Sequence, residues 1–445
     1  MSEWKKVKIG DFLTEREGRY KPDDSKISKY KRLDKIDFSG TIHISDKPTK
    51  TDMIIVHPGD LVISGINVAK GAVAVYQGDE PVCATIHYSS YTFDSSKVDL
   101  DYFKYFVKSP AFIAALQKQV KGGIKTEIKP KHLLPLEISI PDLQTQQEIV
   151  KKISLQLQKT EQLSLEIESQ KNYIKQLRQN ILQDAIEGKL TADWRKKNPV
   201  QKGNPNYDAE ALFEQIQKER NGEKKQKVLS PITDEEKPFE IPEGWKWVRL
   251  GEISESCLGK MLDGIKNQGV NRKYLRNLNV RWFAFDLTDL LEMKIKDEEL
   301  DRCSAKKGDL LICEGGYPGR SAIWNEDYNI CFQKAVHRVR FFLMSDMPYL
   351  FNMYLFYLSE SDKIEEYLTG EGIQHLTGVK LKEMKYSLPP LAEQSEIVHI
   401  LSVLLAKVDK LESQIQEREI FAKQLMQSIL KDAFEERQKN DIKLE

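Results

Sequence analysis

A thirteen-residue segment occurs twice in this chain of 445 residues and constrains its fold more than any other feature. The first copy, KQLRQNILQDAIE, spans 175–187, and the second, KQLMQSILKDAFE, spans 423–435. Nine of the thirteen positions are identical, at a constant offset of 248 residues. A match of this length is hard to obtain by chance. The sequence therefore predicts a tandem repeat in which both halves of the chain carry the same structural unit.

Each copy of the repeat belongs to a long, heptad-patterned segment. The two segments open at Pro141 and Pro389, where a helix accepts proline, and Glu393 suits the first turn of the second helix. Gly188 suits the C-terminal cap of the first. Apolar residues recur at spacings of three and four over five heptads, which is typical of a coiled-coil seam. At about 1.5 Å per residue, each helix would be roughly 65 Å long. The predicted seam residues are Ile153, Leu163, Ile167, Ile174, Leu177, Ile181, Leu401, Leu404, Val408, Leu411, Ile415, Leu425 and Ile429.

The segments that precede the helices repeat more faintly. EWKKVKIGDF at 3–12 resembles GWKWVRLGEI at 244–253, and HPGDLVIS at 57–64 resembles KKGDLLIC at 306–313. The duplicated unit is therefore predicted to be a globular domain followed by a helix. The predicted division of the chain is 1–141 (first domain), 142–188 (first helix), 189–243 (linker), 244–388 (second domain), 389–437 (second helix) and 438–445 (tail). The charge and proline content of the linker predict a tether, anchored locally by Trp194 and Phe213.

The composition excludes several classes of protein. With 68 basic and 68 acidic residues, the net charge is zero, which argues against a protein that coats nucleic acid non-specifically. The sequence has neither an apolar run long enough for a bilayer nor a signal-peptide pattern at MSEWKKVKIG, so a cytoplasmic protein without membrane contact is expected. Its five cysteines include no CxxC pair, so neither structural zinc nor a disulfide framework is predicted.

Basic residues nevertheless cluster in two places. Between 258 and 282 there are six basic residues against one acidic residue, interleaved with asparagines and aromatic residues. Between 121 and 131 four lysines face one glutamate around a Gly-Gly pair. Such patches suit phosphate contact and base reading. A solvated surface that happens to be basic is an equally open alternative for either patch alone.

Motifs for catalysis are missing from the sequence. It contains no GxxxxGK[ST] loop, no HExxH and no GxSxG, and its ExK triplets are expected by accident in a chain that is 31% charged. His87, His337 and His375 are expected to be hydrogen-bonding surface or turn residues. The prediction is a protein with no catalytic residues and no metal site.

Taken together, these motifs resemble those of a known family. The helix openings IPDLQTQQEIV and LPPLAEQSEIV, the domain opening GWKWVRLGEI and the segment GKLTADWRKKNP after the first helix resemble the specificity subunit of type I restriction-modification systems, over essentially the whole chain. The first copy departs in having Asp142 and Thr145 where the second has Pro390 and Glu393, which we interpret as a variation in helix capping.

The resemblance implies an α+β fold. Two mixed α/β target recognition domains would be separated by two long helices packed as an antiparallel coiled coil, in a pseudo-twofold tandem repeat. Each recognition domain would read one half of a bipartite DNA site, and the helices would set the spacer between the halves and dock the methyltransferase subunits.

The resemblance also implies partners that carry the chemistry. They are double-stranded DNA, two methyltransferase (M) subunits and, where present, restriction (R) subunits. This chain would bind no cofactor itself, and S-adenosylmethionine, ATP and Mg are expected on the partner subunits. Two alternatives remain open: a non-catalytic coiled-coil adaptor, and the recognition part of a fused nuclease-methyltransferase.

Candidate DNA-binding residues are those in the basic patches and in glycine-containing loops that follow predicted strands. Arginine can grip guanine bidentately, whereas lysine is less demanding in geometry. For each residue, a role in a turn or on the surface is the competing interpretation. The candidates are Lys70, Lys121, Gly122, Gly123, Lys125, Thr126, Lys260, Lys266, Arg272, Lys273, Arg276, Arg320, Gln333, Lys334, Gln374 and His375.

Overall fold

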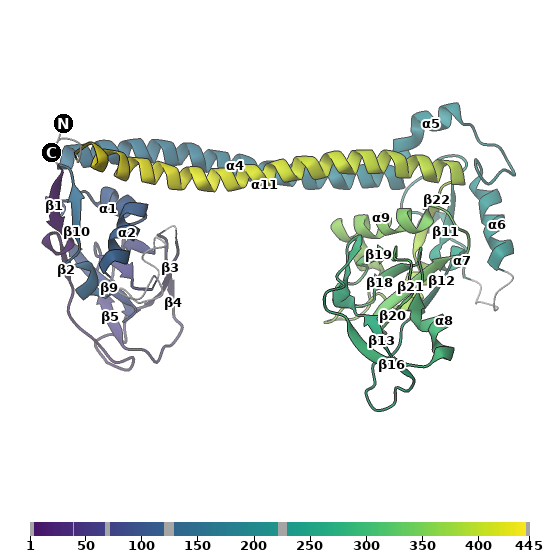
Figure 1. Cartoon of the computed structure of the whole chain (residues 1–445), viewed down its shortest axis with the longest axis horizontal. Helices are drawn as coiled ribbons and strands as arrows, with labels where there is room; N and C mark the ends of the chain where they lie inside the picture. Colours follow the sequence, from purple (N-terminus) through teal and green to yellow (C-terminus); the bar gives the residue numbers. More distant parts are fainter. Residues whose placement is uncertain (1–3, 39, 67–71, 120–128, 221–228, 442–445) are drawn as a thin grey trace. The chain divides into compact units, whose positions relative to one another are not determined.

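The computed structural model describes residues 4–38, 40–66, 72–119, 129–220 and 229–441. It has the predicted α+β composition, and the contacts divide the chain into two compact units (Figure 1). Unit 1 comprises Met1–Ser169 with Ile415–Glu445, and unit 2 comprises Gln170–Gln414. Each long helix therefore contributes one end to each unit.

The described strands of unit 1 form two four-stranded sheets, with the orders β2-β9-β6-β7 and β4-β3-β8-β5, and a two-stranded sheet in which β1 pairs with β10. The central strand β6 (Leu61–Ser64) is buried along its whole length, as its uninterrupted apolar sequence requires. The other elements are β1 Lys5–Lys8, β2 Leu13–Glu15, β3 Arg32–Ile36, β4 Ile42–Ser45, β5 Met53–Val56, β7 Val73–Val75, β8 Val82–Thr85, β9 Tyr88–Phe93, β10 Glu137–Ile140, α1 Leu100–Phe106, α2 Pro110–Gln119 and α3 Pro130–Leu133.

Unit 2 is built in the same way. Its sheets have the orders β12-β21-β18-β19 and β16-β13-β20-β17, and β11 pairs with β22. Strand β18 (Leu310–Cys313) is again fully buried. The other elements are β11 Lys246–Arg249, β12 Ser254–Leu258, β13 Val270–Leu275, β14 Val280–Arg281, β15 Ala284–Phe285, β16 Leu291–Ile295, β17 Ser304–Ala305, β19 Ser321–Ile323, β20 Ile330–Phe332, β21 Val336–Phe341, β22 Lys385–Leu388, α7 Leu250–Ile253, α8 Leu300–Cys303, α9 Met347–Glu360 and α10 Gly378–Glu383.

The duplication extends through both globular parts. The two pairs of four-stranded sheets correspond strand for strand, and both β6 and β18 directly follow an aspartate that comes after a glycine of positive φ. Asp60 is 1% exposed and accepts from Nε of Arg16 at 2.6 Å; Asp309 is 2% exposed and accepts from two nitrogens of Arg340, each at 2.7 Å. The weak similarity between HPGDLVIS and KKGDLLIC therefore reflects the same local structure in both units: a glycine of positive φ and a buried aspartate that directly precede a buried strand.

The long helices α4 (Leu143–Ile186) and α11 (Leu391–Asp441) share the same kind of entry. Gln146 and Gln394 are both fully buried, and each donates from Nε2 to the carbonyl of the proline that opens its segment, at 2.8 and 2.9 Å. Helix α11 continues past residue 437, where the sequence predicted a tail.

Gly188 terminates the first helix, as predicted. Its φ is +74°, and its N–H donates to the carbonyl of Ala185 at 3.2 Å. A Cβ at this position would also lie 2.6 Å from Cγ of Pro242. Only glycine fits this close approach in the left-handed conformation.

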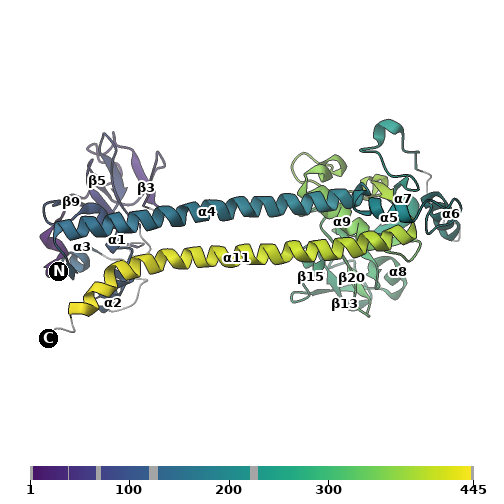
Figure 2. The ribbon, with the colours of Figure 1, turned by 90° about the horizontal axis from the view of Figure 1, so that it is seen from above.

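Helices α4 and α11 run in opposite directions, side by side (Figure 2). In unit 1, Ile153 and Ile429 belong to one apolar cluster, and in unit 2 Ile181 and Leu401 belong to another. One position of the heptad is buried along both helices, except at Ile174. These residues are Ile153, Thr160, Ile167, Ile181, Leu401, Val408, Ile415, Ala422 and Ile429.

The rest of the predicted seam is not buried between the helices. Ile174 and Leu404 are half-buried, and four leucines remain 36–47% exposed: Leu163, Leu177, Leu411 and Leu425. Here the structure differs from the sequence prediction. In these helices one position of the heptad is covered along most of the length, and the second apolar position, which a closely packed coiled coil would also bury, is left partly open to solvent.

The predicted linker is in part core. It contains α5 (Ala192–Lys197) and α6 (Ala209–Arg220), and Ala209, Leu212 and Ile216 are fully buried in unit 2. Their spacing of three and four places them on one face of α6. The prediction of a simple tether was wrong for this segment, because its amphipathic helix packs on the second domain.

Glu393 joins separate parts of unit 2. Its carboxylate is 2% exposed, accepts from Nε1 of Trp245 at 2.7 Å and from the hydroxyl of Thr191 at 2.6 Å, and forms an ion pair with Arg195. Arg195 also donates to the carbonyl of Gly188 at 2.6 Å. Besides complementing the helix dipole, Glu393 therefore ties the end of α4 and the start of the second domain to the first turn of α11.

Candidate nucleic-acid interface

Five segments of unit 2 that are distant in sequence converge into one group of loops, which we call the loop cluster: 259–268, 276–279, 314–320, 332–335 and 369–375. Backbone hydrogen bonds join them. Lys260 donates to Phe332 at 3.0 Å, Lys334 donates to Lys260 at 2.9 Å, and Gly315 bridges to His375. The amide of Asn277 donates to the carbonyl of Gly315 at 3.0 Å. The structure therefore gathers many of the candidate residues into one place.

Several basic candidates in unit 2 have acidic partners. Lys260 pairs with Glu299 and is 16% exposed. Arg272 contacts Asp297 at 2.6 Å, and Arg276 contacts Asp289 at 2.6 Å. Ion pairs of this kind orient the side chains but partly neutralise their charge, so the predicted basic patch is weaker than its sequence implies.

Other candidates are open to solvent. Lys266 is 86% exposed in its side chain, with Asp263 at 3.9 Å, and Lys273, Lys334, Gln374 and His375 are all exposed. Within the described parts of the chain, Lys273 and Lys334 form no ion pair. Gln333 is half-buried, and its backbone N–H donates to Leu275 at 3.0 Å. Exposed lysines can contact phosphates, and exposed amide and imidazole groups can contact base edges.

Arg320 is placed differently from the other candidates. It is 8% exposed, its NH2 donates to the carbonyl of Asn277 at 2.9 Å, and its guanidinium lies over the ring of Tyr317 at 4.0 Å. A direct bidentate contact from this buried group to guanine would require the loop to rearrange. The exposed residue of the pair is Tyr317, at 57%. Tyr317 was not among the sequence candidates, although the Tyr-Pro-Gly-Arg order is a recognisable turn signal.

The candidates of the first half lie outside the described residues. They are Lys70, Lys121, Gly122, Gly123, Lys125 and Thr126. Unit 1 does have a polar hollow of about 300 Å³, to which Arg16, Arg19, His87, Ser90 and Lys129 contribute. Glu15 and Glu17 line the same hollow, so its charge is mixed and it does not by itself indicate contact with a nucleic acid.

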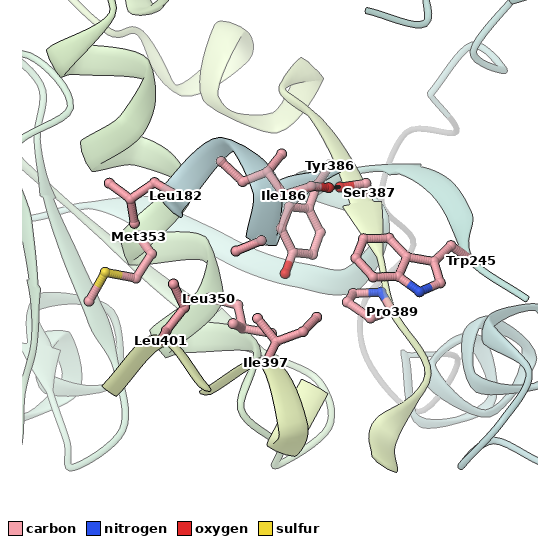
Figure 3. A pocket seen from close by; sticks show the side chains of 11 residues that line it. Leu182, Ile186, Trp245, Leu350, Met353, Tyr386, Ser387, Pro389, Ile397 and Leu401 are labelled. Carbon is pink, nitrogen blue, oxygen red and sulfur yellow. Dashed lines mark hydrogen bonds between the residues drawn. The ribbon is translucent and has the colours of Figure 1, made fainter. Parts of the chain in front are cut away.

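Across the described ranges, no three His, Cys, Asp or Glu side chains converge as metal ligands, and no helix is long and apolar enough to cross a membrane. The apolar hollow near the start of α11, lined by Trp245, Tyr386 and Pro389 among others, has a volume of about 20 Å³, which is too small for a ligand (Figure 3).

His337 corrects an expectation from the sequence. It is not a surface or turn residue but lies in β21, 1% exposed, and its Nε2 is 2.8 Å from the carbonyl oxygen of Leu376. Burial, together with the positive charge of Lys382, lowers the pKa of His337 to about 4. A neutral histidine that donates to a backbone carbonyl holds the 376–378 segment against the sheet.

Comparison with known families decides the relationship. The type I restriction modification DNA specificity domain matches residues 1–172 and again 242–418, so both halves of the chain carry it. The chain belongs to this family. The two matched regions correspond to the two copies of the tandem repeat. The same repeat is seen in the sequence and in the strand order of the two units.

Individual curated members of the family share low sequence identity with this chain over long stretches, or higher identity over a short one. The EcoKI specificity subunit of Escherichia coli K12 is 25% identical over 341 residues, which is 75% of this chain and 64% of that protein. The EcoAI specificity subunit of Escherichia coli is 40% identical, but over 110 residues, which is 23% of this chain and 17% of that protein. The matches to these curated relatives span less than two thirds of their length.

Solved structures share the fold of this specificity-domain protein. A chain from a study of complex assembly and conformational transition of the type I R-M system has a TM-score of 0.62 at 17% identity, with 97% of both chains covered. The HsdS subunit from Thermoanaerobacter tengcongensis has a TM-score of 0.50 at 18% identity, again with 97% of both chains covered. The likeness therefore lies in the fold, because the sequences have diverged widely.

Proposed function

We propose that this chain is the DNA-specificity subunit of a type I restriction-modification complex. Each globular domain reads one half of a bipartite DNA site, and the loop cluster is the reading surface of the second domain. The observation that carries this proposal is the convergence of exposed lysine, amide, imidazole and aromatic side chains from four of the five segments of the loop cluster, in a chain whose two halves both match the specificity domain. Loops on a rigid scaffold can vary in sequence without loss of the fold.

Two methyltransferase subunits dock along the long helices. The support for this is the row of exposed leucines on α4 and α11, which leaves apolar surface on helices that are otherwise strongly polar. These leucines would supply apolar contact area to a partner subunit. The partners supply S-adenosylmethionine, ATP and Mg, and restriction subunits join where the host encodes them.

Methylation of a genome tests the DNA-reading role. The chain is co-expressed with the methyltransferase subunit from its own host in a strain free of adenine methylation, and modified bases are located by sequencing. We expect one motif with two defined halves and a fixed gap, and no modification when the chain is expressed alone. Modification without a sequence motif, or by the chain alone, would contradict the proposal.

Docking is tested by a matched pair of charge substitutions on α11. Leu411 and Ser413 are both exposed. We expect Leu411→Glu to reduce co-purification of the methyltransferase subunit and Ser413→Glu to leave it intact, because only the first change removes apolar contact area. Equal effects of the two variants would mean that general charge, and not the leucine row, governs docking.

The length of the helices sets the gap between the two half-sequences. Removal of one heptad from each helix, residues 161–167 and 409–415, keeps the apolar positions in register and shortens each helix by about 10 Å. The deleted protein should modify the same two half-sequences with a shorter gap between them. If it assembles with its partner and retains the original gap, the helices do not measure the spacing.

A further inference from the structure

The segment Tyr317-Pro318-Gly319-Arg320 forms a tight turn within the loop cluster. The N–H of Arg320 donates to the carbonyl of Tyr317 at 3.1 Å, and Gly319 has a φ of +86°. Proline at the second position and a left-handed glycine at the third are typical of a type II turn. The turn places the first and fourth side chains on the same side of the loop, and so brings the tyrosine ring and the guanidinium together.

Arg320 is buried, and a hydrogen bond to Asn277 holds its guanidinium. Its NH2 donates to Asn277, whose own amide donates to Gly315, and its Nε is buried without a hydrogen-bond partner among the described residues. The next glycine, Gly316, has a φ of +78°, and a Cβ there would lie 2.5 Å from the amide nitrogen of Asn277. The loop can therefore pack against Asn277 only because it carries glycine at this position.

Tyr317 is the outward half of the pair. The guanidinium of Arg320 lies 4.0 Å from the ring centroid and covers part of the ring, whereas the residue as a whole remains 57% exposed. Ile373, on the loop whose His375 bridges to Gly315, is 74% exposed. Because the side chains of Tyr317 and Ile373 are exposed to solvent, they do not contribute to the core of unit 2.

We propose that the ring of Tyr317 contacts a base of the second half-site and that Arg320 is the positioning residue that holds it there. The proposal rests on the function proposed above and names the side chain that does the reading. The ring offers π surface and edge, which suit a base face or a thymine methyl group better than a phosphate. Because the turn and the guanidinium already hold the ring, little conformational entropy is lost on binding.

The test measures discrimination between bases, using the complete complex with the host methyltransferase subunit. Initial methylation rates are compared on a duplex with the wild-type motif and on duplexes with each base pair of the second half replaced in turn. We expect Tyr317→Ala to lower discrimination about 10- to 100-fold at one or two adjacent positions, with the first half read normally. Tyr317→Phe should retain most of the discrimination, because it keeps the ring.

Two further variants complete the test. Tyr328→Ala is the matched control, because Tyr328 is 51% exposed in the same unit but lies outside the loop cluster; discrimination should be unchanged. Arg320→Lys keeps the charge but loses the planar stack, and should relax the same positions as Tyr317→Ala. Folding of each variant is checked by thermal unfolding, and Tyr317→Ala should remain folded, because it loses only the contact with Arg320 and most of its side chain is exposed.

The outcomes separate this inference from the proposed function. If the wild-type complex modifies a defined bipartite motif and Tyr317→Ala retains full discrimination, the reading role of Tyr317 is wrong while the proposed function stands. A uniform loss of rate on all duplexes would also overturn it, because that is the behaviour of a phosphate contact. If the wild-type complex has no motif, both proposals fail.

Discussion

At the scale of single residues, burial gives His337 a measurable effect on stability. Its pKa is lowered from 6.5 to about 4 by burial and by Lys382. Above about pH 6.5 the imidazole is neutral in both the folded and the unfolded chain. Between there and about pH 4 only the unfolded chain takes up a proton, so the free energy of unfolding should fall by about 3 kcal/mol as the pH drops.

Urea unfolding at a series of pH values measures this effect. His337→Gln keeps a side-chain N–H that can donate to Leu376 but cannot titrate in this range. The variant should be less stable than the wild type near pH 7 and should lose less stability on acidification. A wild type and variant with the same pH dependence would show that His337 is not the responsible group.

Glu393 shows how one carboxylate can organise its surroundings. Removal of its side chain leaves the indole N–H of Trp245, the hydroxyl of Thr191 and the charge of Arg195 without their buried acceptor. Glu393→Ala should therefore lower the free energy of unfolding by about 3–5 kcal/mol. Thr145→Ala, at the corresponding position of the first helix, is the matched control and should cost less than about 1 kcal/mol. Similar losses in urea titrations of the two variants would contradict the anchoring role.

At the scale of elements, the two apolar positions of each heptad in the long helices differ in burial. Leu401 is 1% exposed within unit 2, whereas Leu411, on the same helix and in the same unit, is 43% exposed. Leu401→Ala should lower the free energy of unfolding by about 2–5 kcal/mol, and Leu411→Ala by less than about 1 kcal/mol. Chemical unfolding of the purified chain measures both. If the Leu411 variant is the less stable, that leucine is buried in solution and the helices associate along a wider face.

At the scale of the whole molecule, the two units repeat one architecture but should respond separately to damage. Asp60 and Asp309 occupy the same place in corresponding sheets, each buried beside an arginine. Replacement of either by alanine should destabilise its own unit by roughly 2–4 kcal/mol, because the partly exposed arginine and the other donors to the carboxylate lose their buried acceptor. Each variant therefore damages one unit and leaves the other as an internal reference.

The distribution of tryptophan separates the two responses. Trp4 lies in unit 1, and the other five of the six tryptophans lie in unit 2: Trp194, Trp245, Trp247, Trp282 and Trp324. Asp309→Ala should lower the midpoint of the fluorescence transition on heating, whereas Asp60→Ala should change mainly the far-ultraviolet circular dichroism. If both variants shift both signals equally, the chain unfolds as a single cooperative unit.

The sequence by itself determined the repeated parts of this protein. The thirteen-residue match, the glutamine-containing helix entries and the cap at Gly188 all depend on neighbours within a few residues, so their patterns could be read directly. The α+β composition and the antiparallel helices, expected from the family resemblance, also appear in the structure. Local hydrogen bonds and periodic burial leave a local signal.

Only the tertiary structure decided which residues of each sequence pattern are buried and which are exposed to solvent. Heptad spacing does not tell whether a leucine meets a second helix or solvent, so the exposure of Leu411 was not predictable. The burial of His337 and Arg320, and the exposure of Tyr317, depend on strands and loops from distant segments that meet in unit 2. Those contacts depend on how whole sheets pack together. No single stretch of sequence therefore predicts them.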